Sequence, residues 1–220
     1  MLTVVVAAAG IRLGTGAGAL RVVHRAAASL EVIVVLWLGW MAWRARATRP
    51  AVFRAALLAA GLTVLLSVIG IATGQNPPAA WAAANLLGGL ALATVFAWLL
   101  GKLGSDRALI PISPLLASGI VLLLAVQLFL GARLSIVDRF AVALPVHGLV
   151  ALALSALLAW VALARVRGAA GKLLFALALA APIAGFTTLQ YEHSAGAALA
   201  HAAAAALLLA TAAYAFGRGA

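Results

Sequence analysis

The sequence contains no cysteine and few charged residues. The lack of cysteine excludes disulfide bonds, thiolate metal sites and a nucleophilic thiol. Only 9% of the 220 residues are charged, whereas 67% are hydrophobic and the mean hydropathy is +1.20. Soluble domains are roughly half apolar, so this composition excludes an ordinary soluble domain and predicts a polytopic membrane protein.

Acidic residues are the scarcest charged class. Four Asp and Glu residues accompany 15 Lys and Arg residues, which gives a formal net charge of +11. Such a charge would also suit nucleic-acid binding. The basic residues, however, form short clusters between apolar stretches of about 20 residues, the length that spans a bilayer. The pattern therefore predicts lipid phosphates as partners and no nucleic acid.

Glycine, proline and arginine divide the chain into eight apolar segments. We expect transmembrane helices near residues 1–15, 22–43, 52–74, 79–101, 112–132, 141–164, 170–190 and 194–217. These runs do not alternate as barrel strands must, so the predicted fold class is an all-α membrane protein. The first segment is short, reaching roughly 22 Å at about 1.5 Å per residue. It has no basic leader and no cleavage site, which favours a helix over a signal peptide.

The basic residues are divided unequally between the two predicted sides. The richer side carries Arg44, Arg46, Arg49, Arg54, Lys102, Arg107, Arg165, Arg167, Lys172 and Arg218, and the other side carries Arg12, Arg21, Arg25, Arg133 and Arg139. The positive-inside rule makes the richer side cytoplasmic, with both termini inside, in a bacterial-type inner (plasma) membrane. His24, His147 and His201 are then expected near the outer face.

Short motifs recur in the two halves of the chain and indicate an internal duplication. A Gly-x-Arg-Leu motif at 10–13 precedes His24 and recurs at 131–134 before His147. A Gly-x-x-Thr motif at 70–73 precedes Asn85 and recurs at 185–188 before His201, so Asn85 occupies the slot of a histidine.

Each repeat contains four predicted helices, so both repeats enter the membrane in the same sense. We therefore expect two four-helix bundles related by a pseudo-two-fold axis along the membrane normal. The first half comprises residues 1–104 and the second half residues 105–220.

The histidines inside the apolar segments are the candidates for function, because a polar ring in hydrocarbon tends to mark an ion path, a proton relay or a cofactor. His147 and His201 are predicted at one depth, about 10 Å below the surface. Two facing imidazoles at one depth suit heme, whose iron takes an axial nitrogen from each side. The alternative is a hydrogen bond from each histidine to a carbonyl of a neighbouring helix. A zinc site is less favoured, since only Glu192 and His193 lie nearby and structural zinc takes four ligands.

Four arginines lie near the predicted histidine sites. Arg12, Arg25, Arg133 and Arg139 could pair with heme propionates or extend to lipid phosphates. The repetition of Arg12 and Arg133 favours propionates for these two.

Glu31 lies two turns deeper than His24 on the same helix face. A carboxyl group there could shuttle protons or pair with a basic group. The alternative is a protonated carboxyl that hydrogen-bonds to a neighbouring helix.

Taken in order, these motifs resemble the heme A synthase family of cytochrome oxidase assembly. The resemblance rests on His24-Arg25 after the glycine-rich stretch 10–18, on Gln127-Leu-Phe-Leu-Gly131-Ala-Arg133, and on the later His147 and His201. It covers nearly the whole chain. Each motif is short, so its specificity comes from order, spacing and duplication.

The resemblance implies a heme b cofactor in the second half and a heme O substrate in the first half, whose methyl group is oxidised to the formyl group of heme A. His147 and His201 would bind the iron of heme b, accompanied by Arg133 and Arg139. His24 would bind the iron of the substrate heme, with Asn85, Arg12 and Arg25 around it and Glu31 as a further catalytic candidate. Heme O synthase and oxidase assembly proteins would be partners.

Three features depart from the family pattern. The second histidine of the first half is Asn85, the carboxylate three residues before the helix histidine is Arg21, and the cysteine pair of the first outer loop is missing. Arg21 and Asn85 favour a non-catalytic alternative, a heme b-binding electron-transfer or oxidase assembly subunit. The duplication taken alone is also compatible with a small heme-free transporter.

Overall fold

The computed structural model describes residues 3, 17–73, 78–104, 110–136, 143–191 and 194–219. This part of the chain contains seven helices. They are α2 (Ala17–Arg44), α3 (Pro50–Thr73), α4 (Ala79–Leu103), α5 (Pro114–Ile136), α6 (Ala143–Arg165), α7 (Gly168–Gln190) and α8 (Ala195–Gly219). The expected helix over residues 1–15 lies outside the described residues, apart from residue 3.

All seven helices are long and apolar enough to cross a membrane. The qualifying spans run from 21 residues in α5 to 27 residues in α2, and their mean hydropathy reaches 2.4 in α3 and α5. Large apolar side chains such as Ile71 and Leu115 are more than four-fifths exposed, as suits a surface in contact with lipid. The prediction of an all-α, multi-pass membrane protein is confirmed for these seven helices.

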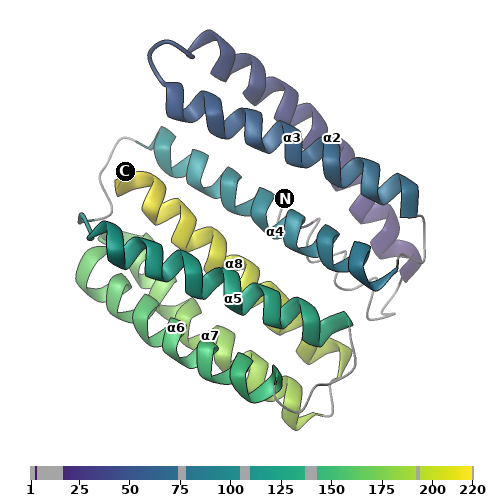
Figure 1. Ribbon diagram of the computed structural model, residues 1–220, viewed down its shortest axis with the longest axis vertical. Helices are drawn as coiled ribbons and strands as arrows, with labels where there is room; N and C mark the ends of the chain where they lie inside the picture. Colours follow the sequence, from purple (N-terminus) through teal and green to yellow (C-terminus); the bar gives the residue numbers. More distant parts are fainter. Residues whose placement is uncertain are drawn as a thin grey trace.

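Helices that follow one another in the sequence pack together in both halves (Figure 1). In the first half α3 packs between α2 and α4, and in the second half α5, α6, α7 and α8 form a bundle. The core of that bundle contains the fully buried side chains of Ile120, Leu158, Val161 and Leu174. Helix α4 joins the halves, because it packs extensively against α8 and also contacts α5.

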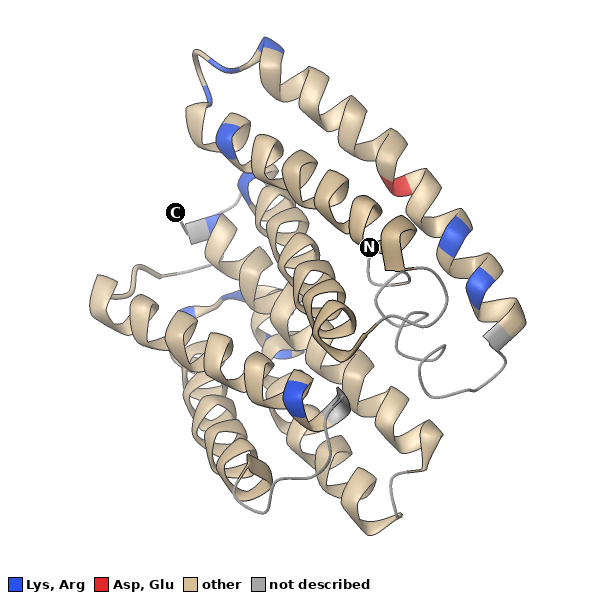
Figure 2. Cartoon of the chain, turned by 45° about the vertical axis from the view of Figure 1, so that its right-hand side comes forward, with Lys and Arg blue, Asp and Glu red and all other residues tan. Residues whose placement is uncertain are grey.

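The two ends of the helix array differ in their side chains. The last turns of α2, α4, α6 and α8 carry Arg44, Lys102, Arg165 and Arg218. Together with the first turns of α3 and α7 they form one end, here called the basic end (Figure 2). The opposite end, here called the histidine end, contains the last turn of α5 with Arg133.

Aromatic rings accompany the cations at the basic end. Among the residues that the structure describes, five cations lie 4.4 to 5.9 Å from the centroid of an aromatic ring: Arg44 over Trp40, Arg46 over Trp43, Lys102 over Trp98, Arg165 over Trp160 and Arg218 over Tyr214. Tryptophan and tyrosine are enriched at membrane–water interfaces. Such pairs are typical of helix ends that lie at a membrane–water interface.

Helices α4 and α8 run in the same direction, and their glycines meet at the basic end. A Cβ atom added to Gly101 would collide with the carbonyl oxygen of Tyr214 and lie 3.0 Å from the Gly217 Cα. A Cβ atom added to Gly217 would collide with the carbonyl oxygen of Trp98 and lie 3.2 Å from the Gly101 Cα. The contact is reciprocal. Each glycine packs against the backbone of the opposite helix, one turn before the glycine of that helix.

Gly101 of α4 and Gly217 of α8 are a fixed number of residues apart, and the same separation in the sequence relates other buried positions of these two helices. Buried positions of α2 and α3 are related in the same way to positions of α6 and α7, each pair of helices with its own separation. The pairs are Leu90–Ala206, Leu92–Leu208, Ala93–Leu209, Ala97–Ala213 and Leu99–Ala215 for α4 and α8, Glu31–Leu154 and Val35–Leu158 for α2 and α6, and Ala56–Gly171, Ala59–Leu174 and Thr63–Ala178 for α3 and α7. The inward-facing positions of the first half therefore recur in the second half.

Candidate functional site

His147 and His201 face each other in the second-half bundle. His147 lies near the start of α6 and His201 in the second turn of α8, so both rings are at the histidine end. Their ring centroids are 6.3 Å apart, and the ring planes are nearly perpendicular, at 83°. Both residues are half-buried. The two histidines that sequence spacing singled out are therefore neighbours in space.

Each of these rings rests against a glycine of the preceding helix. A Cβ atom on Gly131 of α5 would lie 3.2 Å from His147 Cε1, and one on Gly185 of α7 would lie 3.0 Å from His201 Cε1. Such distances are tighter than ordinary van der Waals contact, so a larger residue would displace the ring. These glycines begin the two repeated motifs, and the structure gives a physical reason for them: they leave room for an imidazole.

The ring of His201 is oriented by the backbone of α7. Its Nδ1 lies 3.0 Å from the carbonyl oxygen of Ala181. A carbonyl oxygen only accepts, so Nδ1 carries the proton and donates it. Nε2 of His201 consequently keeps its lone pair. Metal-binding histidines commonly donate the other ring N–H to a carbonyl in this way, which fixes the tautomer.

The ring of His147 has a polar neighbour but an incomplete set of hydrogen bonds. Its Nε2 lies 3.2 Å from Nε2 of Gln127, on α5. Within the described part of the chain, His147 Nδ1 and Gln127 Oε1 are buried and have no hydrogen-bond partner. A buried polar atom without a partner costs about 1–3 kcal/mol. One of these atoms belongs to the imidazole ring and the other to the neighbouring amide. The site therefore contains polar atoms that form no hydrogen bond with the described part of the protein.

The two histidines suit a metal whose remaining ligands are supplied by a cofactor. Within the ranges that the structure describes, no cluster of three or more His, Cys, Asp or Glu side chains could hold a metal ion. Two imidazoles on opposite sides of one metal, at metal–nitrogen distances of about 2 Å, place their ring centroids roughly 6 Å apart. The observed 6.3 Å agrees with this value. A bis-histidine heme takes two axial imidazoles of this kind, so the residues present fit the group.

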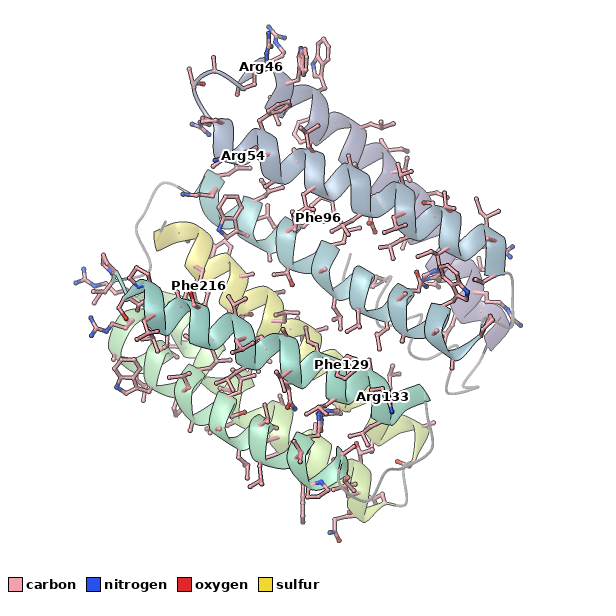
Figure 3. The ribbon with its side chains drawn as sticks, in the orientation of Figure 1. Arg46, Arg54, Phe96, Phe129, Arg133 and Phe216 are labelled. Atoms are coloured by element: carbon pink, nitrogen blue, oxygen red, sulfur yellow. The ribbon has the colours of Figure 1, made fainter. Side chains whose placement is uncertain are left out.

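One described arginine lies at the same end of the bundle as the site. Arg133 is exposed at the end of α5, two residues after Gly131, and Figure 3 places it at the histidine end, far from Arg46 and Arg54 at the basic end. Arg139 lies outside the described residues. The structure thus offers one described cation near the rim of the site for a ligand's carboxylates.

The first half presents a different set of side chains. His24 on α2 and Asn85 on α4 are half-buried, and α3 packs against both helices. Glu31 is buried, with 8% of its surface exposed, on the same face of α2 as His24. Arg21 is half-buried and Arg25 is exposed, whereas Arg12 lies outside the described residues.

Sequence reasoning did not single out the residues that hold the rings. Gln127 entered only as one letter of a family motif, and Ala181 did not enter at all. Which residues of α5 and α7 face the histidines depends on how these helices are rotated in the bundle. The only sequence signal for this rotation is the pair of glycine motifs, because a glycine marks the helix face that approaches a ring.

Comparisons of this chain with protein-family models, with curated proteins and with solved structures found no match. The resemblance to heme A synthases therefore depends on the residues and motifs themselves.

Proposed function

We propose that this protein is a membrane heme protein of the heme A synthase type, with heme b bound by His147 and His201. The observation that carries the proposal is the facing pair of imidazoles. They lie 6.3 Å apart, and Nε2 of His201 keeps its lone pair because Nδ1 donates to the carbonyl oxygen of Ala181. When bound, heme b supplies one-electron redox chemistry. His147 and His201 hold its iron, Gln127 and Ala181 orient the rings, and Arg133 and Arg139 pair with its propionates.

The proposed architecture has eight transmembrane helices in two related halves, residues 1–104 and 105–220. The reciprocal contact of Gly101 with Gly217 supports a pseudo-two-fold axis along the membrane normal, because a parallel helix pair with equivalent contacts in both directions is what such an axis produces. The matching buried positions of α2, α3 and α4 with α6, α7 and α8 also support it.

In the catalytic form of the proposal, the first half binds heme O with its iron on His24. Arg12 and Arg25 would pair with its propionates, and Asn85 on α4 would take the place of a second histidine ligand. Oxidation of its methyl group to a formyl group removes four electrons and four protons and adds one oxygen atom when water is the oxygen source. The electrons would need an acceptor, and heme b in the second half would supply the one-electron chemistry for their transfer. Buried Glu31 is the candidate proton acceptor within the first half.

We further propose the inner (plasma) membrane of a bacterial-type cell as the location, with the basic end and both termini in the cytoplasm. The excess of Lys and Arg at the basic end and the aromatic rings beside them support this orientation. The histidine sites then lie near the outer face, and lipid phosphates contact the basic clusters.

A second candidate is a non-catalytic heme b protein that transfers electrons or assists oxidase assembly. Asn85 favours it, because an amide is a poor axial ligand for heme iron, and so does Arg21, which replaces a carboxylate. Both candidates require a partner: heme O synthase for the enzyme, and an oxidase or its assembly factors for the carrier.

Expression of the full chain with and without a heme O synthase, followed by extraction of the bound hemes, tests the proposal. Heme b together with heme A or heme O supports the enzyme, and heme b alone supports the carrier. A purified protein without heme in both cultures rejects both candidates and leaves the heme-free transporter.

A further inference from the structure

Asn85 stands on α4 where His201 stands on α8. Asn85 and His201 are separated by the same number of residues as Gly101 and Gly217. The same separation relates the Trp98–Lys102 pair of α4 to the Tyr214–Arg218 pair of α8. Both residues are half-buried, on helices that contact each other directly. The register of the two helices is therefore anchored by contacts, and it assigns Asn85 to the histidine position independently of any motif.

His24 stands on α2 where His147 stands on α6. The shift between them pairs Trp37 with Trp160, and it pairs the buried Glu31 and Val35 with the buried Leu154 and Leu158. The two halves thus agree in the helix face that points inward. They differ in one ligand, since the first half has a histidine on its second helix and an amide on its fourth.

The helix that precedes this position also differs between the two halves, when α3 before Asn85 is compared with α7 before His201. Gly185 on α7 approaches the ring of His201, whereas a Cβ atom on the corresponding Gly70 of α3 would meet no described atom within 4 Å. An asparagine side chain is shorter than a histidine side chain. Gly70 is exposed, and no described side chain packs against it as the imidazole of His201 packs against Gly185.

We infer that the first half binds heme through His24 alone and keeps the opposite axial position open to a small exogenous ligand beside the Asn85 amide. The inference rests on the proposed function, because it requires that the first half binds heme. Imidazole suits iron, whereas a neutral amide oxygen suits harder cations. The amide of Asn85 can instead donate a hydrogen bond, and hydrogen-bond donors beside an open axial position govern which ligands heme binds.

The test uses the purified full chain, titrated with hemin, reduced, and exposed to carbon monoxide. The wild type should bind two hemes, one low-spin and one that forms a carbon monoxide complex. His24→Ala should remove that complex. Asn85→His should convert the reactive heme to a low-spin heme that no longer binds carbon monoxide, without loss of heme.

Two further variants separate ligation from folding. His201→Asn copies the first-half arrangement into the second half, and it should create a second carbon monoxide-binding heme. Asn85→Ala should still bind carbon monoxide, but its C–O stretching band should shift because the hydrogen-bond donor is missing. These readouts do not depend on enzymatic turnover.

The unfavourable outcomes are distinguishable. Two low-spin hemes without a carbon monoxide complex, or a complex that persists in His24→Ala or in Asn85→His, overturn the open axial position. A single low-spin heme per chain overturns it as well, while heme b on His147 and His201 stands. A chain that binds no hemin overturns both the inference and the proposed function.

Discussion

His201 donates its Nδ1–H to the carbonyl oxygen of Ala181 across the interface of α8 and α7, at 3.0 Å. This bond leaves a lone pair on Nε2 of His201 and fixes the direction of the ring. The ring of His147 lies 6.3 Å away. Because one ring has a fixed direction and the two rings are neighbours, the second half contains the more complete of the two candidate sites.

Removal of either second-half ligand should abolish the low-spin heme. We expect His147→Ala and His201→Ala each to remove the low-spin absorption spectrum, since one remaining imidazole cannot form a bis-histidine complex. His24→Ala, in the other half, should leave this spectrum intact. Absorption spectra of the reduced, purified variants, normalised to protein, measure the effect. The opposite pattern, with loss only in His24→Ala, would show that the halves are assigned the wrong way round.

The glycines beside the rings should be intolerant of even a methyl group. Gly185→Ala and Gly131→Ala place a Cβ atom 3.0 and 3.2 Å from the ring carbons of His201 and His147. Overpacking of this kind costs about 1–3 kcal/mol, so heme affinity should fall by about tenfold or more.

Gly148→Ala is the matched control for the glycine variants, because a Cβ atom on Gly148 meets nothing within 4 Å although it adjoins His147. Hemin titration of the heme-depleted proteins gives the affinities. Equal affinities for Gly185→Ala and Gly148→Ala would contradict a close-packed imidazole.

Gln127 should tune the heme without being required for its binding. Gln127→Leu removes the amide 3.2 Å from His147 while keeping a similar volume. Loss of a group that orients a metal ligand typically lowers metal affinity about 10–100-fold. We expect that decrease together with a shifted reduction potential and altered low-spin g-values, which a purely structural defect would not produce. Gln190→Leu, at an exposed position at the end of α7, should change none of these quantities.

The sequence predicts the spans well because apolar length is a local property, and it predicts the pairing of His147 with His201 because both lie at one depth. The contacts of Gln127 and Ala181 could not be predicted in this way, since they depend on the rotation of each helix about its axis. The contact between Gly101 and Gly217 also depends on helix rotation and could not be predicted from the sequence. Small residues are common at helix interfaces in membranes, but only the packing of α4 on α8 shows which two glycines meet.

The glycine contact between α4 and α8 should contribute measurably to stability. Gly101→Leu and Gly217→Leu force side chains against the backbone of the opposite helix, so each should destabilise the protein by at least about 1–3 kcal/mol. For chains of 150–250 residues this lowers the thermal midpoint by several degrees, at roughly 2–4 °C per kcal/mol. Circular dichroism of the detergent-solubilised protein measures the shift. Gly61→Leu, at an exposed position of α3 where a Cβ atom meets nothing within 4 Å, is the control.

Because the contact is reciprocal, the two substitutions disturb one interface. Residues that share a contact are not additive, so the double variant Gly101→Leu with Gly217→Leu should be less destabilised than the sum of the single variants. The histidine rings lie at the other end of the helices, and the shape of the low-spin heme spectrum should persist in every variant that remains folded. Fully additive midpoint shifts would mean that the two glycines act at separate interfaces, and they would remove the main support for a pseudo-two-fold axis between α4 and α8.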